Sequence, residues 1–227
     1  MSPYIHVLSA SVMLALAAWI RRSGAERGEP ARYLVVWLAL SAAASLIMAA
    51  SQWVEDETVS LSFAAAARSL GLMGAFIAFV FTRSFSRSPD SSLYFWSLPL
   101  QLGLASNILN WERIYRLEGR TWVLRAGDSL ALAVAVAIWF YYLLALLYAL
   151  LLYSTLKKEG KEMESRRTLV MTLGLLLLMA AGSLGGMVNG VTGHAAVYGS
   201  LGYLAGVLSL VWAFGFPLAS GEPGRWR

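Results

Sequence analysis

Apolar residues dominate seven stretches of the chain, and short polar segments separate these stretches from one another. They cover approximately residues 4–20, 33–50, 61–82, 93–109, 129–156, 168–191 and 195–217. Each stretch is long enough, or nearly so, to cross a hydrocarbon core of roughly 30 Å as a helix. The pattern predicts an all-α membrane protein, a seven-transmembrane helix bundle in which residues 1–227 form a single seven-helix membrane domain.

The fourth and fifth stretches depart most from a regular span. The fourth, residues 93–109, is short and contains Pro99 and Gln101. The fifth, residues 129–156, is longer than a bilayer requires, so we expect it to tilt or to project beyond the membrane.

The segment 110–128 contains a second pattern, between the fourth and fifth stretches. Around Glu118 and Gly119, the sequences IYRL and RTWVL alternate apolar and polar side chains, which is typical of two strands joined by a tight turn. An isolated hairpin is marginal in water. We therefore predict a small extracellular β-hairpin that lies on the outer helix ends, with Trp111 at the membrane interface.

The orientation follows from the eighteen lysine and arginine residues, because basic loops are retained in the cytoplasm. Thirteen lie on one side of the seven predicted spans, and four lie on the other side, all in the segment 110–128. The last one, Arg68, lies inside the third stretch. The asymmetry predicts an N-terminus outside the cell and a cytoplasmic C-terminus.

Composition narrows the class of function. Hydrophobic residues make up 58% of the chain and charged residues 14%, below the roughly 25% of soluble domains. The net charge of +5 arises from residues placed as a membrane protein places them, so we expect no nucleic-acid partner. The absence of cysteine excludes disulfides and thiolate metal sites.

Catalytic chemistry has no visible sequence signature. No lysine lies in an apolar stretch, and all thirteen carboxylates fall in loops or at span ends, which leaves no buried acid for an ion relay. The two histidines, His6 and His194, both lie near outer helix ends, so haem ligation would require the fold to bring them together by coincidence. We therefore expect no enzyme activity, no catalytic residue, no cofactor and no metal site.

Glycines mark a close contact between the sixth and seventh stretches. Gly182, Gly186 and Gly190 recur at four-residue spacing on one helical ridge, and Gly202 and Gly206 do so in the next stretch. Such ridges allow two helices to approach closely. We interpret them as internal packing positions rather than as an oligomerisation face.

Arg68 is the most informative single residue. It lies about two turns, or roughly 10 Å, inside the third stretch, where an unpaired charge is costly. In the structural interpretation it extends outward and pairs with Glu55, Asp56 or Glu57. In the functional interpretation it faces a cavity and binds an anion.

Other polar residues of the spans gather at the same outer end. Helix ends are commonly polar, which accounts for His194, but the inner ends carry no amides to match Asn107 and Asn189. A partly hydrated pocket that opens outward is therefore our hypothesis. Its candidate ligand-binding residues are Arg68, Asn107, Trp111, Asn189 and His194.

The chain contains the segments ARYLVVWLALSAAASLIM, ARSLGLMGAFIAFVFTRSF, SNILN and RRTLVMTLGLLLLMAAGSLGGMVNG, and the predicted hairpin precedes a long fifth helix. Together these features resemble the seven-helix N-terminal sensing region of prokaryotic histidine kinases. The resemblance implies a prokaryotic cell membrane and helices that pass a signal to a kinase. Only residues 218–227 follow the seventh stretch, so we expect no kinase domain in this chain.

Two functions are consistent with these observations. The first is a stand-alone receptor-like module that recognises a ligand or partner at its outer face and acts through another protein. The second is an accessory or structural subunit of a larger membrane protein complex. The expected partners are the lipid bilayer and either other membrane subunits or a signalling protein.

Overall fold

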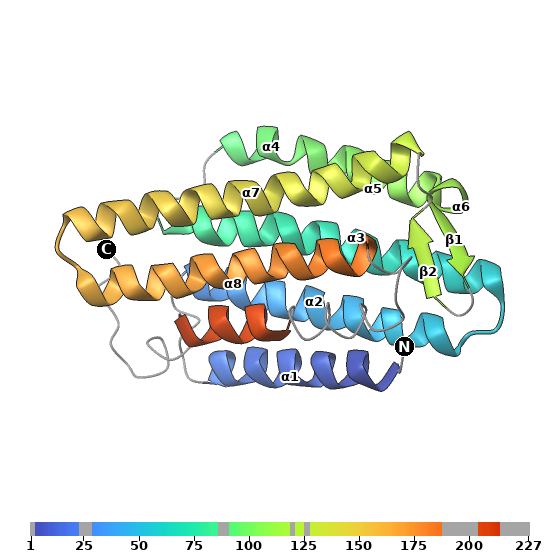
Figure 1. The fold of residues 1–227 in the computed structure, drawn as a ribbon, viewed down its shortest axis with the longest axis horizontal. Coiled ribbons are helices and arrows are strands. Elements are labelled where there is room, and N and C mark those ends of the chain that lie inside the picture. Colours follow the sequence, from blue (N-terminus) through green and yellow to red (C-terminus); the bar gives the residue numbers. More distant parts are fainter. Residues whose placement is uncertain are drawn as a thin grey trace.

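The computed structural model describes residues 3–22, 29–85, 91–118, 121–124, 128–187 and 204–213. Most of these residues belong to five long helices: α1 (Pro3–Arg22), α2 (Glu29–Trp53), α3 (Glu57–Ser84), α7 (Ser129–Lys158) and α8 (Glu162–Met187). The helices lie along one long axis, together with the shorter helix Leu204–Ala213 (Figure 1). The prediction of an all-α protein is confirmed.

Within the described residues, four helices are long and apolar enough to cross a membrane: Tyr4–Arg22, Pro30–Trp53, Glu57–Ser84 and Ser129–Lys158. Large apolar side chains remain exposed on them, and Leu143, Leu147 and Leu151 of α7 are each about half exposed. Soluble proteins rarely expose such wide apolar surfaces. The fold is therefore compatible with a membrane location.

Small residues bring the helix axes together in the core. Ala10 of α1, Ala42 of α2, Ala75 of α3 and Ala145 of α7 are fully buried in one continuous cluster. Inside a bilayer the hydrophobic effect contributes little to helix association, because lipid chains are as apolar as the side chains. Helices associate there through close packing at such small residues. α2 packs between α1 and α3, and α7 packs between α3 and α8.

A break divides the predicted fourth span into α4 (Ser92–Trp96) and α5 (Leu98–Leu109). Pro99 has no N–H group and disturbs the preceding turn. Tyr141 of α7 compensates, because its hydroxyl donates to the Trp96 carbonyl at 2.7 Å and accepts the Leu100 N–H at 2.8 Å. These two groups are four residues apart, so the hydroxyl replaces the helical bond that would join them.

A short helix and two strands follow α5. α6 (Trp111–Ile114) leads into β1 (Tyr115–Glu118), which pairs antiparallel with β2 (Thr121–Leu124). Tyr115 is opposite Leu124, and Glu118 is opposite Thr121. β1 also contacts α3, which anchors the strand pair to the bundle.

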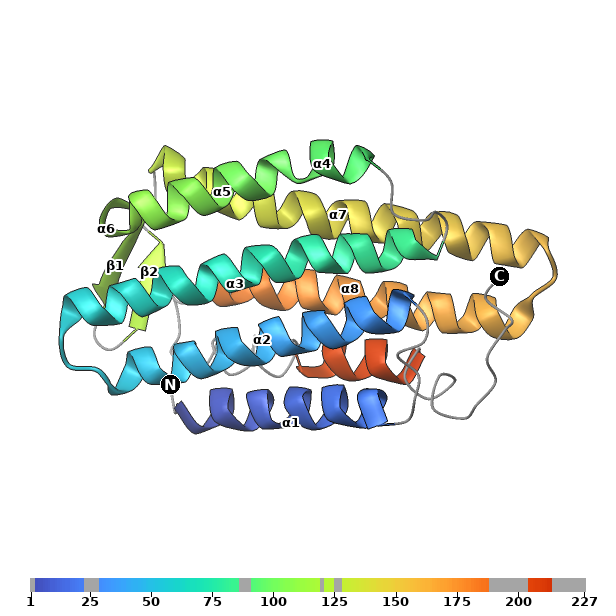
Figure 2. The same cartoon turned by 180° about the vertical axis from the view of Figure 1, so that it is seen from behind.

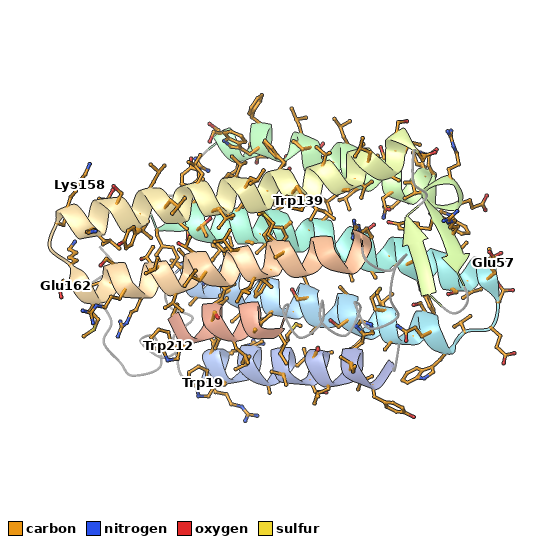
Figure 3. The ribbon with its side chains drawn as sticks, viewed as in Figure 1. Trp19, Glu57, Trp139, Lys158, Glu162 and Trp212 are labelled. Atoms are coloured by element: carbon orange, nitrogen blue, oxygen red, sulfur yellow. The ribbon has the colours of Figure 1, made fainter. Side chains whose placement is uncertain are left out.

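The two ends of the bundle differ in charge. One end holds the C-terminal ends of α1 and α3 and the turn between α7 and α8, whereas the strand pair and the α2–α3 turn lie at the other (Figures 1 and 2). Glu57 and Lys158 mark these opposite ends (Figure 3). The basic residues of the first end include Arg21, Arg22, Arg83, Lys157, Lys158, Lys161, Arg166 and Arg167.

The turn between α7 and α8 sets these two helices antiparallel. Gly160 has a φ of +71°, a conformation that glycine adopts without steric cost. Beside it, Lys161 Nζ lies 2.7 Å from Glu159 Oε2, and this carboxylate raises the pKa of Lys161. The turn thereby places α8 along α7, and the two helices pack against each other.

Of the predicted packing glycines, Gly206 makes a close helix contact. A Cβ atom at Gly206 would lie 2.8 Å from the Gly174 carbonyl oxygen and 2.7 Å from Leu178 Cγ. Its partner in α8 is therefore Gly174, which the sequence pattern did not single out. Gly182 and Gly186 lie on the α8 backbone, and Gly190 and Gly202 lie outside the described residues.

Candidate ligand pocket

Arg68 extends from α3 into a small pocket between three helices. The pocket has a volume of about 50 Å³. α7 supplies four of its lining residues, and α8 supplies two. The lining residues are Arg68, Ala135, Ile138, Trp139, Tyr142, Leu178 and Met179.

The guanidinium of Arg68 has an unmet hydrogen-bonding group. Its Nε atom is buried and has no hydrogen-bond acceptor in the described part of the chain. Arginine stays charged at any accessible pH, so it cannot avoid the cost of burial by losing a proton. Buried polar groups usually have a hydrogen-bond partner, so this Nε atom requires an explanation, such as a bound water, an ion or a functional role.

The acidic residues expected to pair with Arg68 have other surroundings. Glu55, Asp56 and Glu57 are exposed, and no ion pair joins them to Arg68 within the described ranges. Asp56 instead caps α3, because its Oδ1 atom accepts the Val59 N–H at 2.9 Å. The structural interpretation of Arg68 as a partner of this acidic segment is therefore not what the contacts show.

Asn107 forms a buried connection between α5 and α3. Its Nδ2 atom donates to the Ala65 carbonyl at 2.7 Å and to Ser69 Oγ at 2.8 Å. Its Oδ1 atom accepts the Tyr115 hydroxyl, and Asn107 is 0% exposed. Both amide hydrogens are thus used within the protein, which is the arrangement of a structural amide rather than of a pocket wall.

Tyr115 is hydrogen-bonded to Asn107 and also lies close enough to Arg68 to interact with its charge. The phenol is fully buried at the start of β1. Burial raises the pKa of Tyr115, and the nearby Arg68 charge and the hydrogen bond with Asn107 oppose that rise. Tyr115 therefore remains protonated at neutral pH and donates its hydrogen to Asn107.

The remaining candidates divide between the described and undescribed parts of the chain. Trp111 packs against a second hydrophobic cluster, which includes Leu61, Ala64 and Ile114, and it does not line the pocket. Asn189 and His194 lie outside the described residues. Of the five candidates, the pocket therefore contains Arg68, and Asn107 bonds to residues that do not line it.

Sequence reasoning missed the walls of the pocket. Trp139 and Tyr142 lie in an apolar stretch without charge or motif, so their pattern is that of ordinary span residues. The sequence feature that could have indicated these walls was the position of Arg68, because a charged residue inside a span faces neighbouring helices rather than lipid. Within the described ranges, no group of three or more histidine or acidic residues is arranged to hold a metal.

Comparisons with protein-family models, with curated proteins and with solved structures found no match for this chain.

Proposed function

We propose that the chain is a seven-helix membrane module that recognises a ligand in the outer half of the bilayer and acts through another protein. The observation that carries this proposal is the Arg68 guanidinium, which lies in a pocket and has a buried Nε atom without an acceptor in the described residues. A permanently charged donor without a partner is costly within a span and is therefore a mark of function.

The charge difference between the two ends supports the orientation. Basic residues concentrate where α1, α3 and α7 end, and that end corresponds to the cytoplasmic side under the positive-inside rule. The strand pair and the α2–α3 turn then lie outside. Four of the described helices are long and apolar enough to cross a membrane, and we propose α5, α8 and the segment around Leu204–Ala213 as three further spans, which would make seven.

The position of Arg68 along α3 places the pocket below the outer surface. Arg68 is eleven positions after Glu57, the first residue of α3, which corresponds to a rise of roughly 16 Å. α3 is 28 residues long, so Arg68 lies in its outer half. A ligand bound there contacts three helices at once, α3, α7 and α8, and a shift of any one of them can carry a signal toward the inner end.

Reporter fusions test the topology. Fusions after Arg27, Ser88, Gly160 and the C-terminus are expected to report cytoplasm, and fusions at Asp56 and Gly119 are expected to report the outside. An outside signal at Gly160 would contradict the proposed span count.

Co-purification tests the signalling role. Tagged protein extracted from native membranes in mild detergent is expected to bring down a second membrane protein in stoichiometric amount. The Arg68→Gln variant is expected to bind the partner as the wild type does, but the partner is expected no longer to respond to the ligand. This result would separate ligand recognition from assembly with the partner. A partner that remains bound while the response is unaffected by Arg68→Gln would favour the accessory-subunit function, and recovery of a lone monomer would contradict both functions.

A further inference from the structure

The pocket at Arg68 selects the charge of its ligand. Among the seven lining residues, Arg68 alone carries a formal charge at neutral pH. In an apolar environment an ion is stable only when its charge is balanced at close range. A singly charged anion balances Arg68, whereas a doubly charged phosphate leaves one negative charge without a counterion.

The shape of the pocket restricts the anionic group further. Its volume of about 50 Å³ is comparable to that of one or two water molecules. A carboxylate fits this space and matches the planar fork of a guanidinium with two parallel hydrogen bonds. A carboxylate that approaches Arg68 also supplies the acceptor that its Nε atom lacks within the described residues.

The surroundings of the pocket indicate which kind of group is attached to the carboxylate. Among the lining residues, Tyr142 and Leu178 are buried, whereas Ile138, Trp139 and Met179 are partly exposed. α7 and α8 pack against each other, and α3 lies behind them in Figure 1 and in front of them in Figure 2. The mouth of the pocket is therefore at the seam between α7 and α8, and Trp139 lies midway along α7 (Figure 3).

Exposed residues that neighbour the pocket residues along α7 and α8 are apolar. Leu132 and Val136 of α7 and Leu176 and Leu177 of α8 are all exposed, with exposed fractions from 42% to 65%. In a bilayer such a surface contacts lipid chains. A molecule that enters through the seam can therefore place its charged head group beside Arg68 while its apolar part contacts apolar side chains.

Resting on the proposed function, we propose that the ligand is a carboxylate with a long apolar chain, a fatty acid that enters from the bilayer. The carboxylate binds the Arg68 guanidinium, and the first part of the chain lies against Trp139 and Ile138. The rest of the chain runs along the seam between α7 and α8.

Binding of palmitate to the purified protein in nanodiscs tests the proposal, with native mass spectrometry and thermal stabilisation as readouts. Palmitate is expected to bind, and the alcohol of the same chain length is expected to bind at least about tenfold more weakly because it lacks the charge. Arg68→Gln is expected to cause a similar loss, and the control Arg116→Gln, a substitution outside the pocket, is expected to cause none.

A second variant covers the case in which Arg68→Gln fails to fold. Ala135→Leu keeps the arginine and adds bulk to the wall of the pocket, so it is expected to weaken palmitate binding as well. Equal binding of palmitate to wild type and both variants would overturn the proposal. Acetate or chloride that competes as well as palmitate would also overturn it, because the ligand would then be a small aqueous anion.

The outcome for the ligand and the outcome for the function are distinguishable. Failure of palmitate to bind, together with a partner response that depends on Arg68, overturns the fatty acid and leaves the receptor function intact. Palmitate binding without any co-purifying partner supports the ligand and overturns the signalling role.

Discussion

Two neighbouring residues of α3, Arg68 and Ser69, have opposite surroundings. Ser69 accepts a hydrogen from Asn107, which in turn accepts the Tyr115 hydroxyl, and this cluster is closed. Arg68 has a buried Nε atom that meets no acceptor in the described chain. Successive residues of a helix point roughly 100° apart, so the two side chains face different neighbours.

This difference distinguishes polar groups that hold the helices together from polar groups that are available to a ligand. In an apolar environment a polar group that holds helices together has its partners within the protein, because an unmet group is costly. The Asn107 cluster meets this condition, and so does the Tyr141 hydroxyl at the α4–α5 break. The Arg68 Nε atom does not meet it within the described residues, and the proposal of Arg68 as a ligand residue rests on that difference together with its position in the pocket.

The Asn107 cluster provides the largest expected effect. Asn107→Leu removes three hydrogen bonds and leaves a tyrosine hydroxyl and a serine without the amide. At roughly 0.6 to 1.7 kcal/mol for each of the three bonds in a membrane protein, we expect a loss of about 2 to 5 kcal/mol in the free energy of unfolding. Titration with sodium dodecyl sulfate in mixed micelles measures this loss.

Asn110→Leu is the matched control for this substitution. Within the described residues the Asn110 side chain bonds to the Ser106 carbonyl, one turn away along the chain, so we expect a loss below about 1 kcal/mol. Equal losses for the two variants would show that the buried cluster has no special structural role.

The sequence alone predicted the positions of the long helices but not their internal contacts. Continuous apolar runs identify spans because a bilayer requires about twenty such residues. The runs 61–82 and 129–156 lie within α3 (Glu57–Ser84) and α7 (Ser129–Lys158). α3 begins four residues before its run because Asp56 caps the helix at that point, whereas the Asp128 cap of α7 lies immediately before its run. Capping depends on local chemistry rather than on hydropathy.

The candidate site was predicted less completely, for a physical reason. A charge within a span is visible in one sequence, and so Arg68 was identified. Its facing residues are not visible, since Trp139 and Met179 are ordinary apolar residues until the helix rotation is known. Asn107 was identified as polar, but its role depends on contacts 42 and 38 residues away along the chain.

The helix break at Pro99 gives the second largest effect. Tyr141→Phe removes the hydroxyl that joins the Trp96 carbonyl and the Leu100 N–H, so we expect a loss of about 1 to 2 kcal/mol. Faster hydrogen exchange at the Leu100 amide is expected to accompany it. Tyr148→Phe is the control, because the Tyr148 ring contacts Phe79 as the Tyr141 ring does, and this substitution leaves the bridge between Trp96 and Leu100 in place.

The buried phenol of Tyr115 makes the stability of the Asn107 cluster depend on pH. Tyr115→Phe removes one hydrogen bond and is expected to cost about 1 kcal/mol at neutral pH. Because burial raises the pKa of Tyr115 above its ordinary value of 10.0, the folded protein retains this proton where the unfolded chain releases it. The wild type therefore loses stability as pH rises above about 10, and Tyr115→Phe lacks that part of the loss.

Unfolding measured at neutral pH and at about pH 11 tests this expectation. The stability difference between wild type and Tyr115→Phe is expected to shrink at the higher pH. A difference that grows at high pH would contradict a buried, protonated phenol.

Arg68 gives the smallest expected effect on stability, and this is the strictest test of the comparison. In the protein without ligand, Arg68→Met removes a charge whose Nε atom has no acceptor in the described residues and replaces it with an apolar side chain. Replacement of a poorly compensated buried charge by an apolar group is commonly neutral or stabilising. We therefore expect a change within about 1 kcal/mol of zero, against the roughly 2 to 5 kcal/mol of Asn107→Leu. A loss as large as that of Asn107→Leu in ligand-free protein would show that Arg68 already has a strong internal partner, and the distinction between structural and functional polarity on α3 would then fail.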